Sequence, residues 1–168
     1  MIRDLGDYYI WAHNKFREVI KNLTHEEFTQ VEDKVGRSIK DLVIHMIVMT
    51  ESCYSNKPMD VYVKLMEELK TKSKDDIIKF WKTSDENFAD VVDKITEGPV
   101  IFLIWLTDEK MTITAMENLL MFTDHSTYHR GQLMSALKYL GKEGISSDYY
   151  YYLVEKNSKK AVQILESL

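Results

Sequence analysis

The sequence predicts an all-α fold of four long helices packed as a bundle, with one more helix at the C-terminus. Helix-breaking residues are rare, since the 168 residues include 6 glycines and 2 prolines, and long segments run uninterrupted between them. Within these segments apolar residues recur every three or four positions, which is the period of a helix with one buried face. Four long helices joined by short connections favour a bundle.

The first two long helices are expected at residues 4–22 and from Ser38 to about Asn56. An apolar stripe defines the first helix, and Thr24 opens a capping-box pattern that predicts a short helical turn after it. The second helix can begin at Ser38, a good N-cap residue, and Pro58 ends it because the residue before a proline avoids helical geometry. The stripe of the first helix consists of Leu5, Tyr8, Ala12, Phe16, Val19 and Leu23.

The second half predicts two more bundle helices separated by an extended insertion. A shorter helical segment is expected at residues 60–69, and a long helix from the cap signal at Ser73 to Gly98. Residues 100–113 are β-branched and aromatic, which predicts a small hairpin before the last bundle helix. That helix is expected at residues 115–140, because Thr114 opens a capping-box pattern, and a terminal amphipathic helix follows a tyrosine-rich segment.

Length and charge limit the classes of protein to which the chain can belong. We expect one domain over residues 1–168, because this length fits an ordinary single domain. The net charge is −5, and no run of lysine or arginine forms a basic stripe, which argues against nucleic acid as a partner. The sequence contains no continuous apolar run of the kind found in a signal peptide or a membrane span. We therefore expect a cytoplasmic protein with no membrane partner.

Three histidines form a candidate metal site. His125 and His129 are four residues apart on an expected helix, so their imidazoles project from one face. His45 lies on the apolar face of another helix, where a neutral imidazole would need partners for both nitrogens. The pattern alone leaves a metal site and ordinary structural roles equally open. His13 lies off the main apolar stripe and His25 in a connecting turn, so both are expected at the surface.

The segment from Asp124 to Leu133 resembles the signature helix of the DinB-like (DinB/YfiT) superfamily, whose pattern is His, three residues, then His-Arg-Gly-Gln. Other family-like features follow in the right order: Tyr9-Ile10-Trp11-Ala12, Ser38-Ile39-Lys40-Asp41-Leu42 before His45, and Asp148 after the last bundle helix. The resemblance extends to about Leu153. One departure is Trp11-Ala12-His13-Asn14, where the family usually has Trp-Ala-Asn, and it affects the expected wall of the pocket.

This resemblance implies an up-down four-helix bundle with an unusual connection and a divalent ion held by His45, His125 and His129. Some members of the superfamily are thiol-dependent transferases or isomerases that use mycothiol, bacillithiol or glutathione, and many others have no established activity. Membership therefore does not by itself assign a reaction.

Three neutral imidazoles would leave an ion at least one open coordination position, as in catalytic zinc sites. Zinc is the first expectation, with nickel, iron or manganese as alternatives, because imidazole ligands do not select among these ions. The leading hypothesis is a metal-dependent thiol-transferase-like enzyme acting on a small-molecule thiol and an electrophilic substrate. The alternatives are a metal-binding stress or interaction protein without turnover, and a metal-dependent hydrolase. A fourth protein ligand would argue against an enzyme.

The remaining candidates carry no assigned catalytic role. Asp124, Glu51 and Tyr128 are candidates for a general base or a support of the site. Arg130 could bind an anionic substrate or, equally, an acidic neighbour within the bundle.

The sequence predicts no protein nucleophile and favours association of two copies of the chain. Cys53, the single cysteine, lies on an apolar face and is expected in the core, and the sequence offers no plausible Ser-His-Asp or Cys-His arrangement. The apolar stripe at residues 149–152 favours a homodimer.

Overall fold

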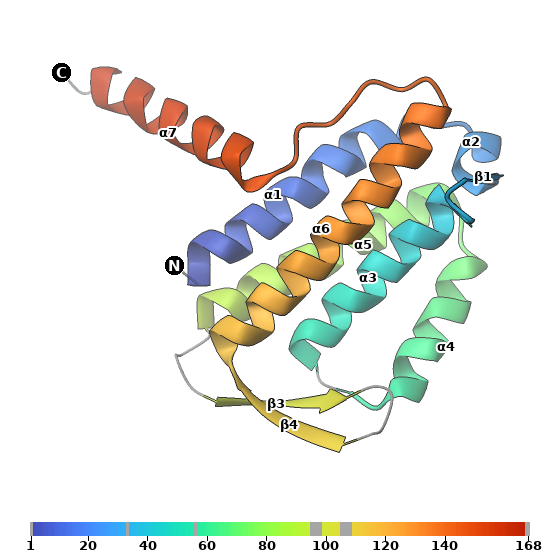
Figure 1. The fold of residues 1–168 in the computed structure, drawn as a ribbon, viewed down its shortest axis with the longest axis horizontal. Coiled ribbons are helices and arrows are strands. Elements are labelled where there is room, and N and C mark those ends of the chain that lie inside the picture. Colours follow the sequence, from blue (N-terminus) through green and yellow to red (C-terminus); the bar gives the residue numbers. More distant parts are fainter. Residues whose placement is uncertain (1, 33, 56, 95–98, 105–108, 167–168) are drawn as a thin grey trace.

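The computed structural model describes residues 2–32, 34–55, 57–94, 99–104 and 109–166, and its central feature is a four-helix bundle (Figure 1). The predicted all-α bundle is therefore confirmed. Each of the four helices packs against two of the others. The bundle helices are α1 (Ile2–Ile20), α3 (Ile39–Ser55), α5 (Lys74–Lys94) and α6 (Ala115–Tyr139).

The four helices run in pairs, with α1 and α6 in one direction and α3 and α5 in the other (Figure 1). The Lys74 amine at the start of α5 donates a hydrogen bond to the Lys21 carbonyl just after α1, at 2.7 Å, so these two helices are antiparallel. Helix α4 (Met59–Lys70) leads from the end of α3 back to the level at which α3 began. This extra helix is the unusual connection, because it lets α5 run parallel to α3.

Side-chain caps set several helix boundaries where the sequence predicts them. Thr24 and Thr114 each form a complete capping box, in which the threonine hydroxyl accepts a backbone N–H and a glutamate three residues later accepts the threonine N–H. The Ser38 and Ser73 hydroxyls likewise accept backbone N–H groups at the starts of α3 and α5, at 3.0 Å and 3.2 Å. Thr24 opens the short helix α2 (His25–Thr29).

A β-hairpin lies at one end of the bundle, between α5 and α6 (Figure 1). Its strands, β3 (Pro99–Ile104) and β4 (Glu109–Thr114), are antiparallel, with Pro99 opposite Thr114 and Ile104 opposite Glu109. The predicted hairpin before the last bundle helix is thus confirmed. Gly98, the expected end of α5, and residues 105–108 of the expected hairpin lie outside the described residues.

A second, much shorter antiparallel pair joins β1 (Val31–Glu32) to β2 (Arg37–Ser38) just before α3, with Glu32 opposite Arg37. Gly36 has a φ of +71°, a conformation that glycine adopts at little cost, and it positions the chain for β2. The sequence pattern does not predict this pair, because two-residue strands show no periodicity.

The core fills the space between the four bundle helices. Large side chains that are essentially inaccessible to solvent come from α1, α2, α3, α5 and α6, among them Phe16, Phe28, Ile47, Trp81 and Phe122. Among the described residues, none of the helices has the length and apolar character needed to cross a membrane.

Helix α7 (Tyr149–Glu166) attaches to α1 by its first turns and then extends away from the bundle (Figure 1). The Trp11 indole donates a hydrogen bond to Glu155 at 3.1 Å, and the ring of Tyr152 packs against that of Tyr8 with 5.7 Å between centroids. Of the tyrosine-rich segment, Tyr152 is buried, whereas residues 149–151 remain exposed.

Candidate metal centre

The structure brings His45 of α3 together with His125 and His129 of α6. The Nε2 atom of His125 lies 3.4 Å from that of His45 and 3.0 Å from that of His129. One nitrogen of each imidazole lies within 4.8 Å of the others. Nitrogen ligands of a tetrahedral ion at about 2.0–2.1 Å are roughly 3.3 Å apart, which is close to the two measured separations. The three side chains therefore fit a single divalent ion.

The hydrogen bond of His129 shows which of its nitrogens can face an ion. Its Nδ1 lies 2.8 Å from Oε1 of Gln132, an atom that only accepts, so Nδ1 carries the proton. The Nε2 lone pair of His129 then points toward the other two histidines. If two of the three imidazoles shared one proton in a hydrogen bond, the inward-facing nitrogen of the third would have no partner. A cation would accept the lone pairs of all three nitrogens.

All three imidazoles are neutral near neutral pH. Burial is the largest effect on each and lowers the pKa of His125 and His129 below its usual value. For His45, burial is the largest cause, and the repulsion that a protonated His45 would feel from a protonated His129 and from Arg37 adds to it, so the pKa falls to about 4. Neutral rings offer their lone pairs to a metal without competition from protons.

A cavity of about 240 Å³ lies beside His45, which is the one histidine of the cluster that forms part of its wall. Within the described residues, no cysteine, aspartate, glutamate or further histidine joins the three imidazoles closely enough to act as a fourth ligand. The cluster thus leaves a coordination position for a ligand that is not part of the chain. The cavity is lined by Arg37, Asp41, Ile44, His45, Met66 and Lys70.

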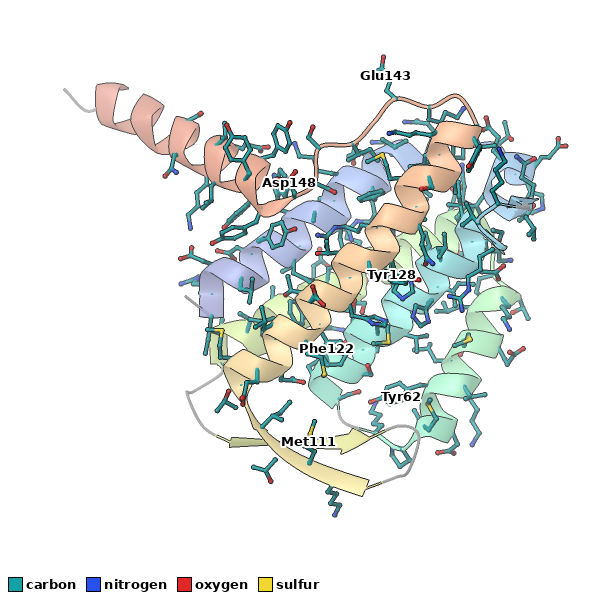
Figure 2. All side chains as sticks on the ribbon, in the orientation of Figure 1. Tyr62, Met111, Phe122, Tyr128, Glu143 and Asp148 are labelled. Atoms are coloured by element: carbon teal, nitrogen blue, oxygen red, sulfur yellow. The ribbon has the colours of Figure 1, made fainter. Side chains whose placement is uncertain are left out.

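The other sequence candidates lie outside the cluster. Asp124 lines a different cavity, between α6 and the start of α7, and Glu51 accepts a hydrogen bond from the Tyr54 hydroxyl at 2.5 Å. Tyr128 is 65% exposed and lies on α6, where its hydroxyl accepts a hydrogen bond from the Gln132 amide at 3.2 Å (Figure 2). The Tyr128 ring also packs edge-to-face on the imidazole of His129, with 5.0 Å between centroids.

Cys53 does not supply a nucleophile. Burial raises the pKa of its thiol far above neutral pH, so the reactive thiolate is not formed there. The Asn118 amide donates hydrogen bonds to its carbonyl and, at 3.8 Å, to its sulfur. Cys53 is partly buried and packs against the core, so the predicted core position is confirmed in part.

Arg130 does not form an ion pair with a described acidic neighbour, which is one of its two expected roles. Its guanidinium is buried and donates hydrogen bonds to the hydroxyls of Tyr8, Ser126 and Thr127 at 2.6–3.0 Å. None of the described carboxylates forms an ion pair with it. It joins α6 to α1 through hydroxyl groups.

His13 corrects a second expectation, because it is fully buried between α1, α5 and α6 rather than exposed. Its Nδ1 lies 2.9 Å from Oδ1 of Asp85, and its Nε2 lies 3.0 Å from Oγ of Ser126. Asp85 also pairs with Arg17. The expectation that the chain has no Ser-His-Asp arrangement is therefore wrong, because Ser126, His13 and Asp85 are hydrogen-bonded in that order. The exposed position expected for His25 is confirmed.

The proton positions in this network follow from its charges. The indole N–H of Trp81 also points at His13 Nδ1, at 3.1 Å, but one nitrogen cannot both accept from Trp81 and donate to Asp85. The bond to an ionised carboxylate is the stronger of the two, so Nδ1 carries the proton and Nε2 accepts from the Ser126 hydroxyl. Ser126 is only 4% exposed and its oxygen also accepts from Arg130, so the network joins three helices rather than presenting a nucleophile.

Together, the fold and the cluster define the class: a four-helix-bundle protein with three histidines able to hold one divalent ion. The chain belongs to the DinB family, whose family model matches residues 2–160.

Two comparisons with individual proteins agree with this assignment. The chain is 24% identical to Protein DinB of Bacillus subtilis (strain 168) over 173 residues, covering 94% of this chain and 96% of that protein. Its fold is similar to that of YfiT from Bacillus subtilis, with a TM-score of 0.57 and 13% identity over 83% of this chain and 87% of that structure. YfiT is described as a probable metal-dependent hydrolase with an unusual four-helix bundle topology.

Proposed function

We propose that this protein is a metal-dependent enzyme that binds one divalent ion through His45, His125 and His129 and uses it to activate a small molecule. The convergence of three neutral imidazoles beside a cavity, with no fourth ligand among the described residues, is the observation that carries the proposal. Three protein ligands with an open position are typical of catalytic metal sites, whereas structural sites use four.

A bound ion would supply positive charge that lowers the pKa of a thiol or water placed in the open position. The chain's own contribution is to hold the imidazoles in place. Gln132 fixes the ring of His129 by accepting its Nδ1–H, and such supporting hydrogen bonds tune metal affinity. Since Ser126 is buried in the His13 network and burial keeps the Cys53 thiol protonated, the nucleophile would come from the substrate.

Thiol transfer is the reaction class that we place first. The thiol would lose its proton to solvent, its sulfur would form a bond to an electrophilic carbon, and the leaving group would depart with the electron pair of the broken bond. Soft sulfur and neutral imidazole ligands suit zinc, our first choice of ion, with nickel, iron or manganese as alternatives.

Hydrolysis is the second candidate, and the structural similarity to YfiT favours it. In that case water would take the place of the thiol at the same site. A third candidate is a metal-binding protein without turnover, in which the ion joins α3 to α6. The two reactions are distinguished by whether turnover requires added thiol.

Element analysis of the purified protein tests the metal site. We expect about one divalent ion per chain in the wild type, and loss of at least 90% of it in His45→Ala and in His129→Ala, because two imidazoles hold an ion far more weakly than three. His25→Ala is the control, since His25 is exposed and lies outside the cluster. Equal metal content in all four proteins would contradict the proposal.

A further inference from the structure

The cavity beside His45 contains a positive charge that the described part of the chain does not neutralise. In Figure 1 this region lies where α4 runs beside α3, near β1. Two of the lining side chains are positively charged and one is negatively charged: Arg37, Lys70 and Asp41. Lys70 pairs with Glu67 at 2.8 Å, and Asp41 accepts a hydrogen bond from the Ser38 hydroxyl at 2.6 Å.

Arg37 differs from these neighbours because no described carboxylate lies within 4.0 Å of its guanidinium. It lines the same cavity as His45, so its guanidinium is placed to contact a molecule that lies beside this imidazole.

We infer that the substrate carries a carboxylate or a similar small anionic group, and that Arg37 binds this group beside the three histidines. The inference rests on the proposed metal-dependent function. Three neutral imidazoles leave the charge of a divalent ion uncompensated, so the ion and Arg37 together favour an anion in the cavity. The planar guanidinium matches the two oxygens of a carboxylate, and the apolar walls at Ile44 and Met66 can accept the carbon part of the molecule.

Pairs of small probes that differ in charge test this inference on the cobalt-loaded full-length protein. The visible absorption of cobalt(II) changes when a ligand enters its coordination sphere, so binding is measured without turnover. Mercaptoacetate is compared with 2-mercaptoethanol, and acetate with acetamide. We expect the anionic member of each pair to bind about three- to tenfold more tightly, as one partly exposed charge-assisted contact allows.

Three variants assign the preference to one side chain. Arg37→Gln should lower the preference for the anionic probe to the smaller value that the ion alone gives, whereas Arg37→Lys should keep more of it through the retained charge. Lys34→Gln removes one positive charge from the same hairpin but from a residue that stacks on Tyr139 and does not line the cavity, so it should keep the full preference. All three variants should bind cobalt as the wild type does.

Failure of the inference and failure of the proposed function give different results. Equal binding of both members of each pair by the wild type, or an unchanged preference in Arg37→Gln, would overturn the role of Arg37 while leaving the metal site intact. If neither thiol alters the cobalt spectrum, thiol transfer fails, and the acetate pair alone decides the role of Arg37. A wild-type protein that does not bind cobalt would overturn both proposals.

Discussion

At the scale of single residues, the candidate site depends on side chains that hold the imidazoles in place through hydrogen bonds. Gln132 accepts the Nδ1–H of His129 and in turn donates to Tyr128, so it controls both the tautomer and the orientation of this ring. On the neighbouring face of α6, Ser126 and Arg130 take part in the buried network around His13. Each of these contacts can be removed by one substitution.

Replacing Gln132 tests its effect on metal affinity. We expect Gln132→Leu to weaken metal binding by about 10- to 100-fold, the range found when the hydrogen-bond partner of a ligating histidine is lost. Competition with a chromophoric chelator measures the change. Gln132→Glu keeps an acceptor for His129 and should retain most of the affinity, as should Tyr128→Phe, which removes only the outer hydroxyl. An unchanged affinity in Gln132→Leu would show that His129 is oriented by packing alone.

His13 should make stability depend on pH. Burial, the largest cause, lowers its pKa, against the opposing effect of Asp85, while Arg17 and Arg130 lower it further. The unfolded chain therefore binds a proton below about pH 6.5 that the folded protein excludes, and stability present above that pH is lost as the pH falls. Urea unfolding should show this loss, up to roughly 1.4 kcal/mol per pH unit from this residue.

The variant His13→Gln isolates this contribution, because the other histidines titrate in the same way in both proteins. We expect a less stable protein at pH 7.5 and a shallower loss of stability between pH 6.5 and pH 5. Identical slopes for the two proteins would mean that His13 is accessible to protons in the folded state. Measurements in the presence of a chelator remove the contribution of bound metal.

At the scale of elements, α6 uses two neighbouring faces with the same four-residue spacing. His125 and His129 face α3, whereas Ser126 and Arg130, one position later in each case, face α1. A small rotation of α6 would disturb both sets at once. The buried network therefore also restricts the orientation of the two histidines on α6.

The contact between α1 and α5 leaves no room for a side chain at Gly6. A Cβ atom at this position would lie 2.7 Å from a methyl carbon of Val92. We expect Gly6→Ala to lower the free energy of unfolding by about 1 kcal/mol, because overpacking outweighs the better helix propensity of alanine. Gly131→Ala on α6 is the matched control, since nothing lies within 4 Å of its added Cβ, and it should raise stability by up to about 1 kcal/mol. Thermal unfolding of both variants measures these changes in stability. A Gly6→Ala variant more stable than the wild type would contradict the close packing of α1 against α5 at this position.

Much of this architecture can be predicted from the sequence because local signals determine it. Capping residues at Thr24, Ser38, Ser73 and Thr114 mark helix starts, and the four-residue spacing on α6 indicates the histidine pair. What escapes prediction depends on contacts between distant segments. His13 lies off the main stripe of α1, but α1 packs against both α5 and α6, so its buried face is wider than that stripe.

Arg37 and Gln132 also lack a decisive local signal. Arg37 lies on a two-residue strand that no periodicity reveals, and only the fold places it beside α3 and α4. Gln132 follows His129 by three residues, a helical spacing that permits the observed hydrogen bond, but this spacing is too common to indicate a supporting role by itself. Its place in the His-Arg-Gly-Gln segment could have prompted the assignment.

At the scale of the whole molecule, a bound ion would join α3 to α6, two helices that are otherwise held together by packing and by a few hydrogen bonds such as that from Asn118 to the Cys53 carbonyl. We expect a chelator to lower the melting temperature of the wild type, since an ion at 100 times its dissociation constant adds about 2.7 kcal/mol. The same chelator should leave His45→Ala unchanged. An equal shift in both proteins would place the stabilising ion elsewhere.

The homodimer expected from the tyrosine-rich segment stays a prediction. Helix α7 exposes Tyr150, Leu153 and Val154 on the part of its surface that the structure describes. Burial of these side chains between two copies would favour association. Sedimentation velocity should give a dimer for the wild type and a monomer for Tyr150→Asp combined with Leu153→Asp, and a monomeric wild type would contradict the prediction.

The connecting helix α4 has a consequence for how such proteins can diverge. It supplies Met66 and Lys70 to the cavity, while the three histidines come from α3 and α6. Substitutions in α4 could therefore change the size and charge of an accepted molecule without touching the ligands of the ion. Under the proposed function, a bundle built in this way can acquire new substrates by varying one peripheral segment while its central chemistry is inherited unchanged.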